Sequence, residues 1–388
     1  MIALSSITLD PARGITRDSL RPPQLRNAAY AGQYDWDTLF YDVYRAGPHV
    51  VLQGPPFLNL LDHLEHSAPL RAAFGFPRFA AHHYGQKKRG EIWWRSDADR
   101  FTLDGPLGRF DIAVQPDGAP LFAGRRVITT LSKDNDLRWI ADWVRFYRRI
   151  HGADGVLVYD NGSSAYGLAE LQATLDEAAE GAMVARAVAW PFRYGPQGGL
   201  AGMVDGVEPD WDSDFCQTGS LQHARFRFLR RAASVLNVDI DELVLPAAGR
   251  SIFEAAERSR SGFVKFPGLW IGTHAPHGAT RATSRHGDFL YREAPDAREC
   301  PPKWCLAAAR ADRRAYSWSV HNLFGAKANA TISDAFAYRH FRAITTSWKD
   351  DRWQGLPTAT HGPWLDEQLA ATLAEAGLAP AIGDAPES

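Results

Sequence analysis

The chain has 388 residues, a formal net charge of −2 and 45% hydrophobic residues. A chain of this length and apolar content can bury a full core, and it has room for one large domain with an appendage. Because the charge is close to neutral, no extended basic surface is expected, which argues against nucleic acid as a partner. No stretch approaches the ~18 consecutive apolar residues of a membrane-spanning helix, so no transmembrane segment is expected.

The first residues and the cysteines bear on the compartment of the protein. Met1 to Leu20 lack a basic segment followed by an apolar one, so no secretion signal is expected. The three cysteines are too few for a disulfide framework, and their odd number fits a reducing compartment. The sequence therefore predicts a cytoplasmic protein.

Residues 1–124 predict a small α+β subdomain with short elements. Periodic and alternating apolar patterns, separated by Asp-Gly turns, indicate where these elements lie. The expected helices cover 34–45 and 58–66, and the expected strands cover 49–53, 91–95, 101–103 and 109–114.

The next segment predicts a strand–helix–strand unit. Arg126–Leu131 is rich in β-formers, and apolar residues recur at helical spacing over 137–150. Gly155–Asp160 is the next apolar run, and Asn161 follows it. Such a unit is a right-handed parallel crossover whose second strand delivers Asp160 to the carboxyl edge of the sheet. Ligands of open α/β sheets bind at that edge.

Two further helices are expected later in the chain. The segment 221–236 carries arginines at 225, 227, 230 and 231, which we expect on a solvated face. Residues 365–376 predict a terminal helix, and residues 377–388 predict a disordered tail.

Three carboxylates, Asp239, Asp241 and Glu242, lie in the otherwise apolar run 237–245, which predicts a buried strand. On a strand, Asp239 and Asp241 share one face and Glu242 points to the other. Buried carboxylates cost free energy unless positive charge pairs with them, and a divalent cation that carries a diphosphate would supply it. Without such a cation, removing the charge of Asp241 should leave stability unchanged or raise it. By itself, Asp-x-Asp also fits a surface turn or a salt-bridged strand end.

An ordered set of motifs resembles the GT-A glycosyltransferases, and within them the family-2-like and family-92-like bacterial enzymes. The matching motifs are Lys133-Asp134-Asn135, the strand end Tyr159-Asp160-Asn161, the Asp-x-Asp at 239–241, Gln217 and Gln222, Lys303-Trp304, Ser319 to Asn322, and His340-Phe341-Arg342. The resemblance departs at 133–135, where the family usually has Lys-Asn-Glu. It implies a Rossmann-like mixed sheet with helices on both faces over 125–345, followed by a C-terminal helix and tail over 346–388.

The resemblance also implies an activity and a set of site residues. The expected reaction moves a sugar from a nucleotide-sugar, expected to be a UDP-sugar, to a glycan or glycoconjugate acceptor. Mn²⁺ or Mg²⁺ would be bound by Asp239, Asp241 and His321; as an alternative, His321 would be a core histidine on a strand over 316–321. The donor nucleotide would contact Lys133, Asp160, Asn161, Asp239, Lys303, Lys349 and Arg352, although exposed salt bridging is the commoner role of such cations.

Two other kinds of protein remain open from the sequence. One is a noncatalytic nucleotide- or carbohydrate-binding protein with a degenerate GT-A fold, which would bind a nucleotide without turning over a sugar-nucleotide. The other is a different α/β enzyme, but the chain lacks the Gly-x-Ser-x-Gly elbow, the Gly-x-Gly-x-x-Gly turn and the phosphate loop of such enzymes. For a catalytic base, Asp288 and Glu293 lie in a suitable region, and nothing in the spacing selects either.

Overall fold

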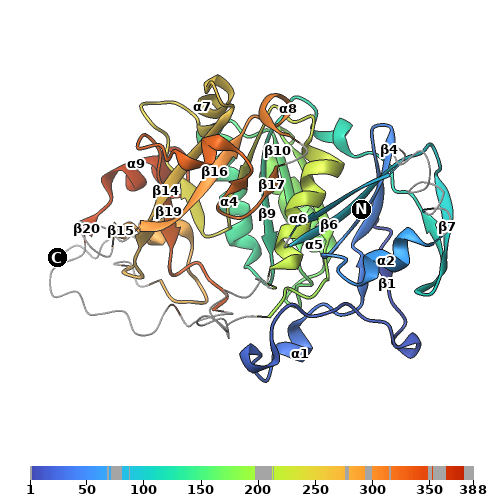
Figure 1. Ribbon diagram of the computed structural model, residues 1–388. Helices are drawn as coiled ribbons and strands as arrows, with labels where there is room; N and C mark the ends of the chain where they lie inside the picture. The colour runs from blue at the N-terminus through green and yellow to red at the C-terminus, as the bar shows by residue number, and fades with distance from the viewer. Residues whose placement is uncertain are drawn as a thin grey trace, which may run out of the picture. The chain divides into compact units, whose positions relative to one another are not determined.

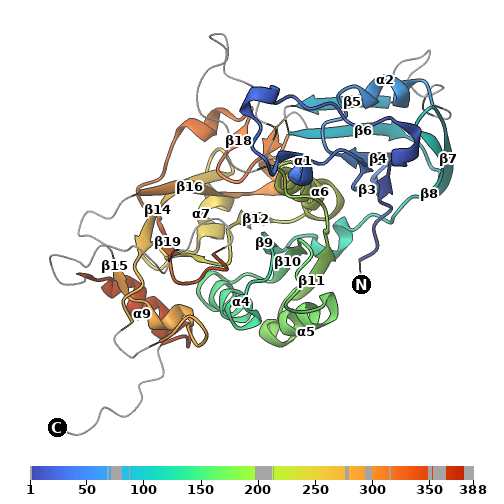
Figure 2. The ribbon, with the colours of Figure 1, turned by 90° about the horizontal axis from the view of Figure 1, so that it is seen from below.

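The computed structural model describes residues 2–67, 70, 81–86, 88–196, 212, 214–275, 279–292, 299–313, 316–347, 352 and 364–379, with the backbone alone for 81–86 and 299. The chain forms two compact units, and Figures 1 and 2 label most of their elements. The sheet unit contains Phe122–Ala189 and Leu229–Ser388, and the N-terminal unit contains Ile2–Leu121 and Trp190–Phe228. Residues 190–228 thus cluster with the N-terminal segment, whereas the sequence placed them in the domain over 125–345.

The sheet unit is a mixed α/β unit whose described strands form a ten-stranded sheet. The strand order is β11-β10-β9-β12-β16-β14-β15-β20, with β19 beside β14 and β13 beside β19. The strands are β9 (Arg126–Ser132), β10 (Gly155–Asp160), β11 (Val184–Ala189), β12 (Ser234–Asn237), β13 (Glu242–Val244), β14 (Phe263–Ile271), β15 (Tyr291–Arg292), β16 (Glu299–Leu306), β19 (Tyr338–Phe341) and β20 (Trp364–Leu365). A separate short hairpin joins β17 (Ser317–Trp318) and β18 (Leu323–Phe324).

The predicted crossover is confirmed. Helix α4 (Leu137–His151) connects the parallel strands β9 and β10, and α5 (Leu168–Ala179) connects β10 to β11. The Asp136 side chain caps α4 by accepting the Arg138 backbone N–H at 2.8 Å, and Gly152 ends the helix in the left-handed conformation. From β11 the chain returns to the other side of β9 as β12, which is also parallel to β9. The strand order therefore reverses between β9 and β12.

Alternate strand residues and the helices form one large core in the sheet unit. Ile128, Val156 and Leu236, from β9, β10 and β12, are fully buried with residues of α4, α5 and α7 (Ile252–Arg258). Each such side chain contributes about 1.5–3 kcal/mol when it is fully buried. The C-terminal helix α9 (Glu367–Glu375) joins the same core, which confirms the expected terminal helix, and α8 (Ala308–Ala311) follows β16. Covering helices on the second face of the sheet stay a prediction.

The run 237–245 is not the single strand that its apolar pattern predicts. β12 ends at Asn237, and β13 begins at Glu242 and pairs with β19 instead of β9. A turn separates the two strands, because the Glu242 backbone N–H donates to the Asp239 carbonyl oxygen at 3.1 Å. The two aspartates therefore lie in a turn, and the strand alternation does not apply to them.

The N-terminal unit contains an antiparallel sheet in the order β3-β4-β6-β5, together with two small pairings, β7 with β8 and β1 with β2. Its elements are β1 (Ile7–Thr8), α1 (Tyr30–Gln33), β2 (Thr38–Phe40), β3 (Asp42–Ala46), β4 (His49–Gly54), α2 (Leu60–Glu65), β5 (Ala81–Gln86), β6 (Arg89–Arg95), β7 (Arg100–Gly105), β8 (Gly108–Ala113) and α6 (Phe215–His223). The helix expected over 34–45 is wrong. Buried Arg17 donates to the carbonyl oxygens of Asp35, Thr38 and Pro56, and these tertiary bonds hold the segment extended.

The helix expected over 221–236 is also wrong in extent and exposure. Helix α6 ends at His223, and a π-helical segment, Ala224–Leu229, follows it. Arg225 and Arg227 are buried, and the Asp42 carboxylate accepts hydrogen bonds from Arg227 at 2.7 Å and from His223 at 2.8 Å. In the part of the chain that the structure describes, no helix has both the length and the apolarity needed to cross a membrane.

Candidate functional site

The candidate site lies at the carboxyl edge of the parallel strands, where the strand order reverses. In the paired register, Asn237 lies opposite Thr129, and Asp160 lies opposite Ser132. Because β9, β10 and β12 are parallel, Asp160 and the 239–241 turn emerge at the same edge of the sheet, with β9 between them. Ligands of doubly wound sheets bind outside the carboxyl ends of the strands at such a reversal.

The loops after β9 and β10 are tied to each other by hydrogen bonds. The Asp134 carboxylate accepts the backbone N–H groups of Ser164 at 2.6 Å and Ala165 at 2.9 Å, and the Asp134 N–H donates to the Ser163 hydroxyl at 2.8 Å. The Asp160 carboxylate accepts the Ser163 hydroxyl at 2.5 Å, and the Asn161 N–H donates to the Ser132 carbonyl oxygen at 2.8 Å. These hydrogen bonds fix the loops after β9 and β10 against each other at the carboxyl edge of the sheet.

Two predicted donor-binding cations have no described role at this edge. Lys133, which the sequence predicts to contact the nucleotide, lies in the loop after β9, and its side chain is exposed. Lys349 lies outside the described residues. Their predicted contacts with the donor stay predictions.

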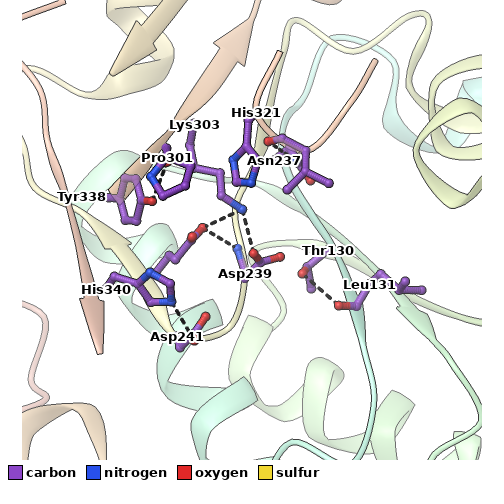
Figure 3. Close-up of polar contacts among 12 residues, drawn as sticks. Thr130, Leu131, Asn237, Asp239, Asp241, Pro301, Lys303, His321, Tyr338 and His340 are labelled. Atoms are coloured by element: carbon purple, nitrogen blue, oxygen red, sulfur yellow. Dashed lines mark hydrogen bonds and ion pairs between the residues drawn. The ribbon is translucent and has the colours of Figure 1, made fainter. Parts of the chain in front are cut away.

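Beyond β12, the turn of residues 238–242, called the acid turn here, surrounds a buried lysine. Lys303 of β16 places its Nζ 2.6 Å from Asp239 Oδ2 and 3.0 Å from Glu242 Oε2. Burial would lower the pKa of Lys303, but the carboxylates of Asp239 and Glu242 raise it above its ordinary value. Burial raises the pKa of Glu242 to about 7, against the opposing charge of Lys303. Lys303 is therefore an ammonium held by these two carboxylates, and Figure 3 shows its contact with Asp239.

Asp241 pairs with a second set of cations. Its Oδ2 lies 3.0 Å from His340 Nε2 and 2.8 Å from Arg352 Nη1. Burial opposes ionisation of Asp241, but the charges of His340 and Arg352 hold the pKa of this carboxyl well below its usual range. Burial would lower the pKa of His340, and the Asp241 charge instead raises it to about 10. The imidazole of His340 stacks on Trp270 with the ring centres 3.9 Å apart.

His321 lies in the 319–322 turn, not on a strand, and its side chain is close to Lys303 and Asp239 (Figure 3). Its Nδ1 lies 3.1 Å from the Pro302 carbonyl oxygen. A carbonyl oxygen can only accept, so Nδ1 carries the proton and Nε2 presents a lone pair. Burial lowers the pKa of His321 to about 4, and the Lys303 charge adds to this. His321 is therefore a neutral imidazole near pH 7.

The predicted metal ligands are suitable in kind but do not converge. Carboxylate oxygens and a neutral imidazole are donors that Mn²⁺ accepts. However, in the described ranges no group of three His, Cys, Asp or Glu side chains lies close enough to hold a metal ion. Asp239 is paired with Lys303, and Asp241 is paired with His340 and Arg352. The described residues, as arranged, do not form a metal centre.

Polar side chains of α4 support the backbone of the acid turn and β13. The Tyr147 hydroxyl donates to the Glu242 carbonyl oxygen at 2.9 Å and accepts the Val244 N–H at 3.0 Å. His151 Nε2 lies 2.7 Å from the Val244 carbonyl oxygen. These residues were missed from the sequence, where Tyr147 counts only as part of the apolar stripe. Their contacts depend on how α4 packs, so no local pattern could have indicated them.

A second support reaches the acid turn from the loop after β14. His286 Nε2 lies 2.9 Å from the Ile240 carbonyl oxygen, and Arg285 forms an ion pair with Asp142 of α4. The candidate base Asp288 is occupied locally, because its carboxylate accepts the Arg285 N–H at 2.7 Å. Glu293, the other candidate base, lies outside the described residues.

No family model matches the chain, and no curated protein matches it. The chain is similar to a solved structure of the galactosyltransferase LgtC in complex with donor and acceptor sugar analogues, with 13% identity and a TM-score of 0.24, over 49% of this chain and 60% of LgtC. An active-site mutant of LgtC matches with 14% identity and a TM-score of 0.23, over 48% of this chain and 60% of the mutant. The chain thus spans about 60% of the length of these proteins, and TM-scores this low assign no function to it.

Proposed function

We propose that this protein is a GT-A-type glycosyltransferase that moves a sugar from a nucleotide-sugar donor, expected to be a UDP-sugar, to a glycan or glycoconjugate acceptor. The observation that carries the proposal is the cluster at the strand reversal, where Lys303, His340 and Arg352 meet Asp239 and Asp241. Breaking the bond between a sugar and a nucleoside diphosphate builds negative charge on the leaving phosphates. Fixed cations beside that point stabilise such charge without reorganisation.

The exposure of these groups supports the same assignment. The side chain of Lys303 is fully buried, whereas the side chains of Arg352 and Asp239 are 28% and 35% exposed. Arg352 can therefore meet a phosphate from solvent, since a guanidinium binds phosphate oxygens in pairs. Asp160 and Asn161, at the same edge, remain the proposed contacts of the nucleoside.

Participation of Mn²⁺ or Mg²⁺ through Asp239, Asp241 and His321 stays part of the proposal. Binding of the metal would require the side chains to move, because Lys303 now lies against Asp239 and Arg352 against Asp241. A diphosphate would contribute oxygen ligands of its own, so the metal should bind better with the nucleotide than alone.

A binding and turnover screen tests the proposed function. Thermal shifts are measured with UDP, GDP and their sugars, each with Mn²⁺ and with a chelator, and release of the nucleoside diphosphate is followed over time. A ligand at a hundred times its dissociation constant should stabilise the protein by about 2.7 kcal/mol. Asp241→Asn should lose turnover, whereas Asp334→Asn, at an exposed carboxylate, is the matched control.

The outcomes of this screen distinguish a transferase from a noncatalytic binding protein. Binding with turnover supports the transferase, and binding without turnover of any sugar-nucleotide favours the noncatalytic binding protein. No binding of any nucleoside diphosphate, with or without metal, would refute both. Equal affinity with Mn²⁺ and with chelator would remove the metal and leave the transferase standing.

A further inference from the structure

One row of side chains crosses three adjacent strands behind the site. Trp304 of β16 lies directly opposite Asn237 of β12 on one side and opposite Lys265 of β14 on the other. Residues directly opposite on paired strands point to the same face of a sheet. Asn237, Trp304 and Lys265 therefore form one row on one face.

All three members of this row donate a hydrogen bond to the 319–322 turn. Trp304 Nε1 donates to the Ser319 carbonyl oxygen at 2.7 Å, and Asn237 Nδ2 donates to the Val320 carbonyl oxygen at 3.2 Å. Lys265 Nζ donates to Asn322 Oδ1 at 2.8 Å. His321 lies inside the segment that these three donors hold, so the row determines where its imidazole lies.

The turn also has internal bonds that link its Asn322 end to the rest of it. The Ser319 N–H donates to the Asn322 carbonyl oxygen at 2.9 Å, which closes the turn. Asn322 Oδ1 accepts a second bond, from Asn329 Nδ2 at 3.3 Å. Asn322 is therefore held to the turn through its backbone, and its side chain is held by Asn329 and Lys265.

A buried lysine at position 265 costs free energy of folding. It is 8% exposed, and its ammonium contacts two neutral acceptors, Asn322 Oδ1 and the Asn329 carbonyl oxygen at 3.3 Å. No carboxylate of the described residues forms an ion pair with it, and burial lowers the pKa of Lys265. Burying a charge without a counter-charge costs free energy. Methionine has a similar length and lacks that cost, so stability alone does not explain a lysine here.

We propose that Lys265 is a positioning residue, which holds the Asn322 end of the turn and so directs the Nε2 lone pair of His321 toward the acid turn. The inference rests on the proposed function, in which His321 is a proposed ligand of the metal at that site. The Pro302 carbonyl oxygen selects the tautomer by accepting from Nδ1 at 3.1 Å, but only while the turn stays in register with the sheet. Without the Lys265 bond, the imidazole should leave Pro302 and exchange between tautomers.

The test compares Lys265→Met with Lys327→Met in the full chain. Lys327 is an exposed lysine of the same region, so it controls for the change of side chain. Two-bond proton–nitrogen spectra of histidine-labelled protein at pH 7 report which ring nitrogen carries the proton, and a His321→Gln spectrum assigns the signals. The melting temperature and Mn²⁺–UDP affinity are measured on the same samples.

For Lys265→Met we expect an unchanged or higher melting temperature, together with ring-nitrogen signals of His321 that move toward each other. Mn²⁺–UDP affinity should fall about tenfold, as is typical when a residue that orients a ligand is removed. Lys327→Met should match the wild type in all three measurements. A residue with only a structural role would lower the melting temperature and leave the His321 signals in place.

Asn322→Ala removes the same hydrogen bond from the acceptor side. If Lys265→Met does not fold, the His321 signals are measured on Asn322→Ala instead. Unchanged His321 signals in whichever variant folds overturn the proposal. If the wild type binds no nucleoside diphosphate, with or without Mn²⁺, the proposed function fails, while the nitrogen signals still decide whether Lys265 positions His321.

Discussion

His151, at the end of α4, should make the stability of the sheet unit depend on pH. Its Nε2 lies 2.7 Å from the Val244 carbonyl oxygen, and its Nδ1 accepts the Ile252 N–H at 3.3 Å. Both ring nitrogens are therefore satisfied only in the neutral form. A proton on Nδ1 would face another donor inside the core. Burial accordingly lowers the pKa of His151 from 6.5 to about 4.

The direction of the effect follows from proton binding. The folded pKa lies below the unfolded one, so between pH 6.5 and about 4 the unfolded chain binds more protons. The neutral His151 contributes its whole share to the free energy of unfolding above pH 6.5. This contribution falls as the pH drops, and it is lost below the folded pKa. The whole shift corresponds to roughly 3 kcal/mol, and at pH 4.5 the loss should be roughly 2–3 kcal/mol.

Urea unfolding of the wild type and His151→Gln at pH 7 and pH 4.5 measures this term. Gln can donate to Val244 but leaves the Ile252 N–H without an acceptor, so the variant should be about 1–2 kcal/mol less stable at pH 7. At pH 4.5 the stability difference should shift in favour of His151→Gln by roughly 2–3 kcal/mol, so that the variant becomes the more stable protein. His274→Gln, at an exposed histidine, is the control. An equal difference between His151→Gln and the wild type at both pH values would refute the reasoning.

Two further substitutions test the site and its scaffold. Asp241→Asn should lower stability by about 3 kcal/mol, because it leaves His340 and Arg352 without their carboxylate. The sequence alone predicts no loss, and a melting temperature equal to that of the wild type and Asp334→Asn would favour that view. Gly268→Ala should cost about 1–3 kcal/mol, because its Cβ would lie 2.2 Å from the Tyr338 ring, which must then move. Gly167→Ala, whose Cβ meets nothing closer than 3.7 Å, is the control, and equal melting temperatures of the two alanine variants would contradict the expected clash.

The sequence by itself determined the crossover from β9 to β10 and the edge of the sheet at which the candidate site lies. The helix over 137–151 has a local signal, an apolar stripe between an aspartate cap and a glycine stop, so its stripe and both of its ends can be located from the sequence of the segment itself. The same holds for Asp160, because a carboxylate directly after a parallel strand reaches the ligand edge of the sheet wherever that strand is placed.

The segment 34–45 shows the limit of such signals. Its pattern predicts a helix, but Arg17, far away in the chain, donates to the carbonyl oxygens of Asp35 and Thr38 and holds the backbone extended. Tertiary hydrogen bonds to the backbone outweigh a weak helix preference, since propensity amounts to less than about 1 kcal/mol per residue.

Only the tertiary structure decided what neutralises the carboxylates of the acid turn. The sequence showed that Asp239 and Asp241 need positive charge, and the structure supplies it as Lys303, His340 and Arg352, which lie 64, 99 and 111 positions away from their partners. These pairs form because β16 lies against β12, and β19 against β13. The pairing of distant strands is a property of the assembled sheet, and no spacing along the chain contains it.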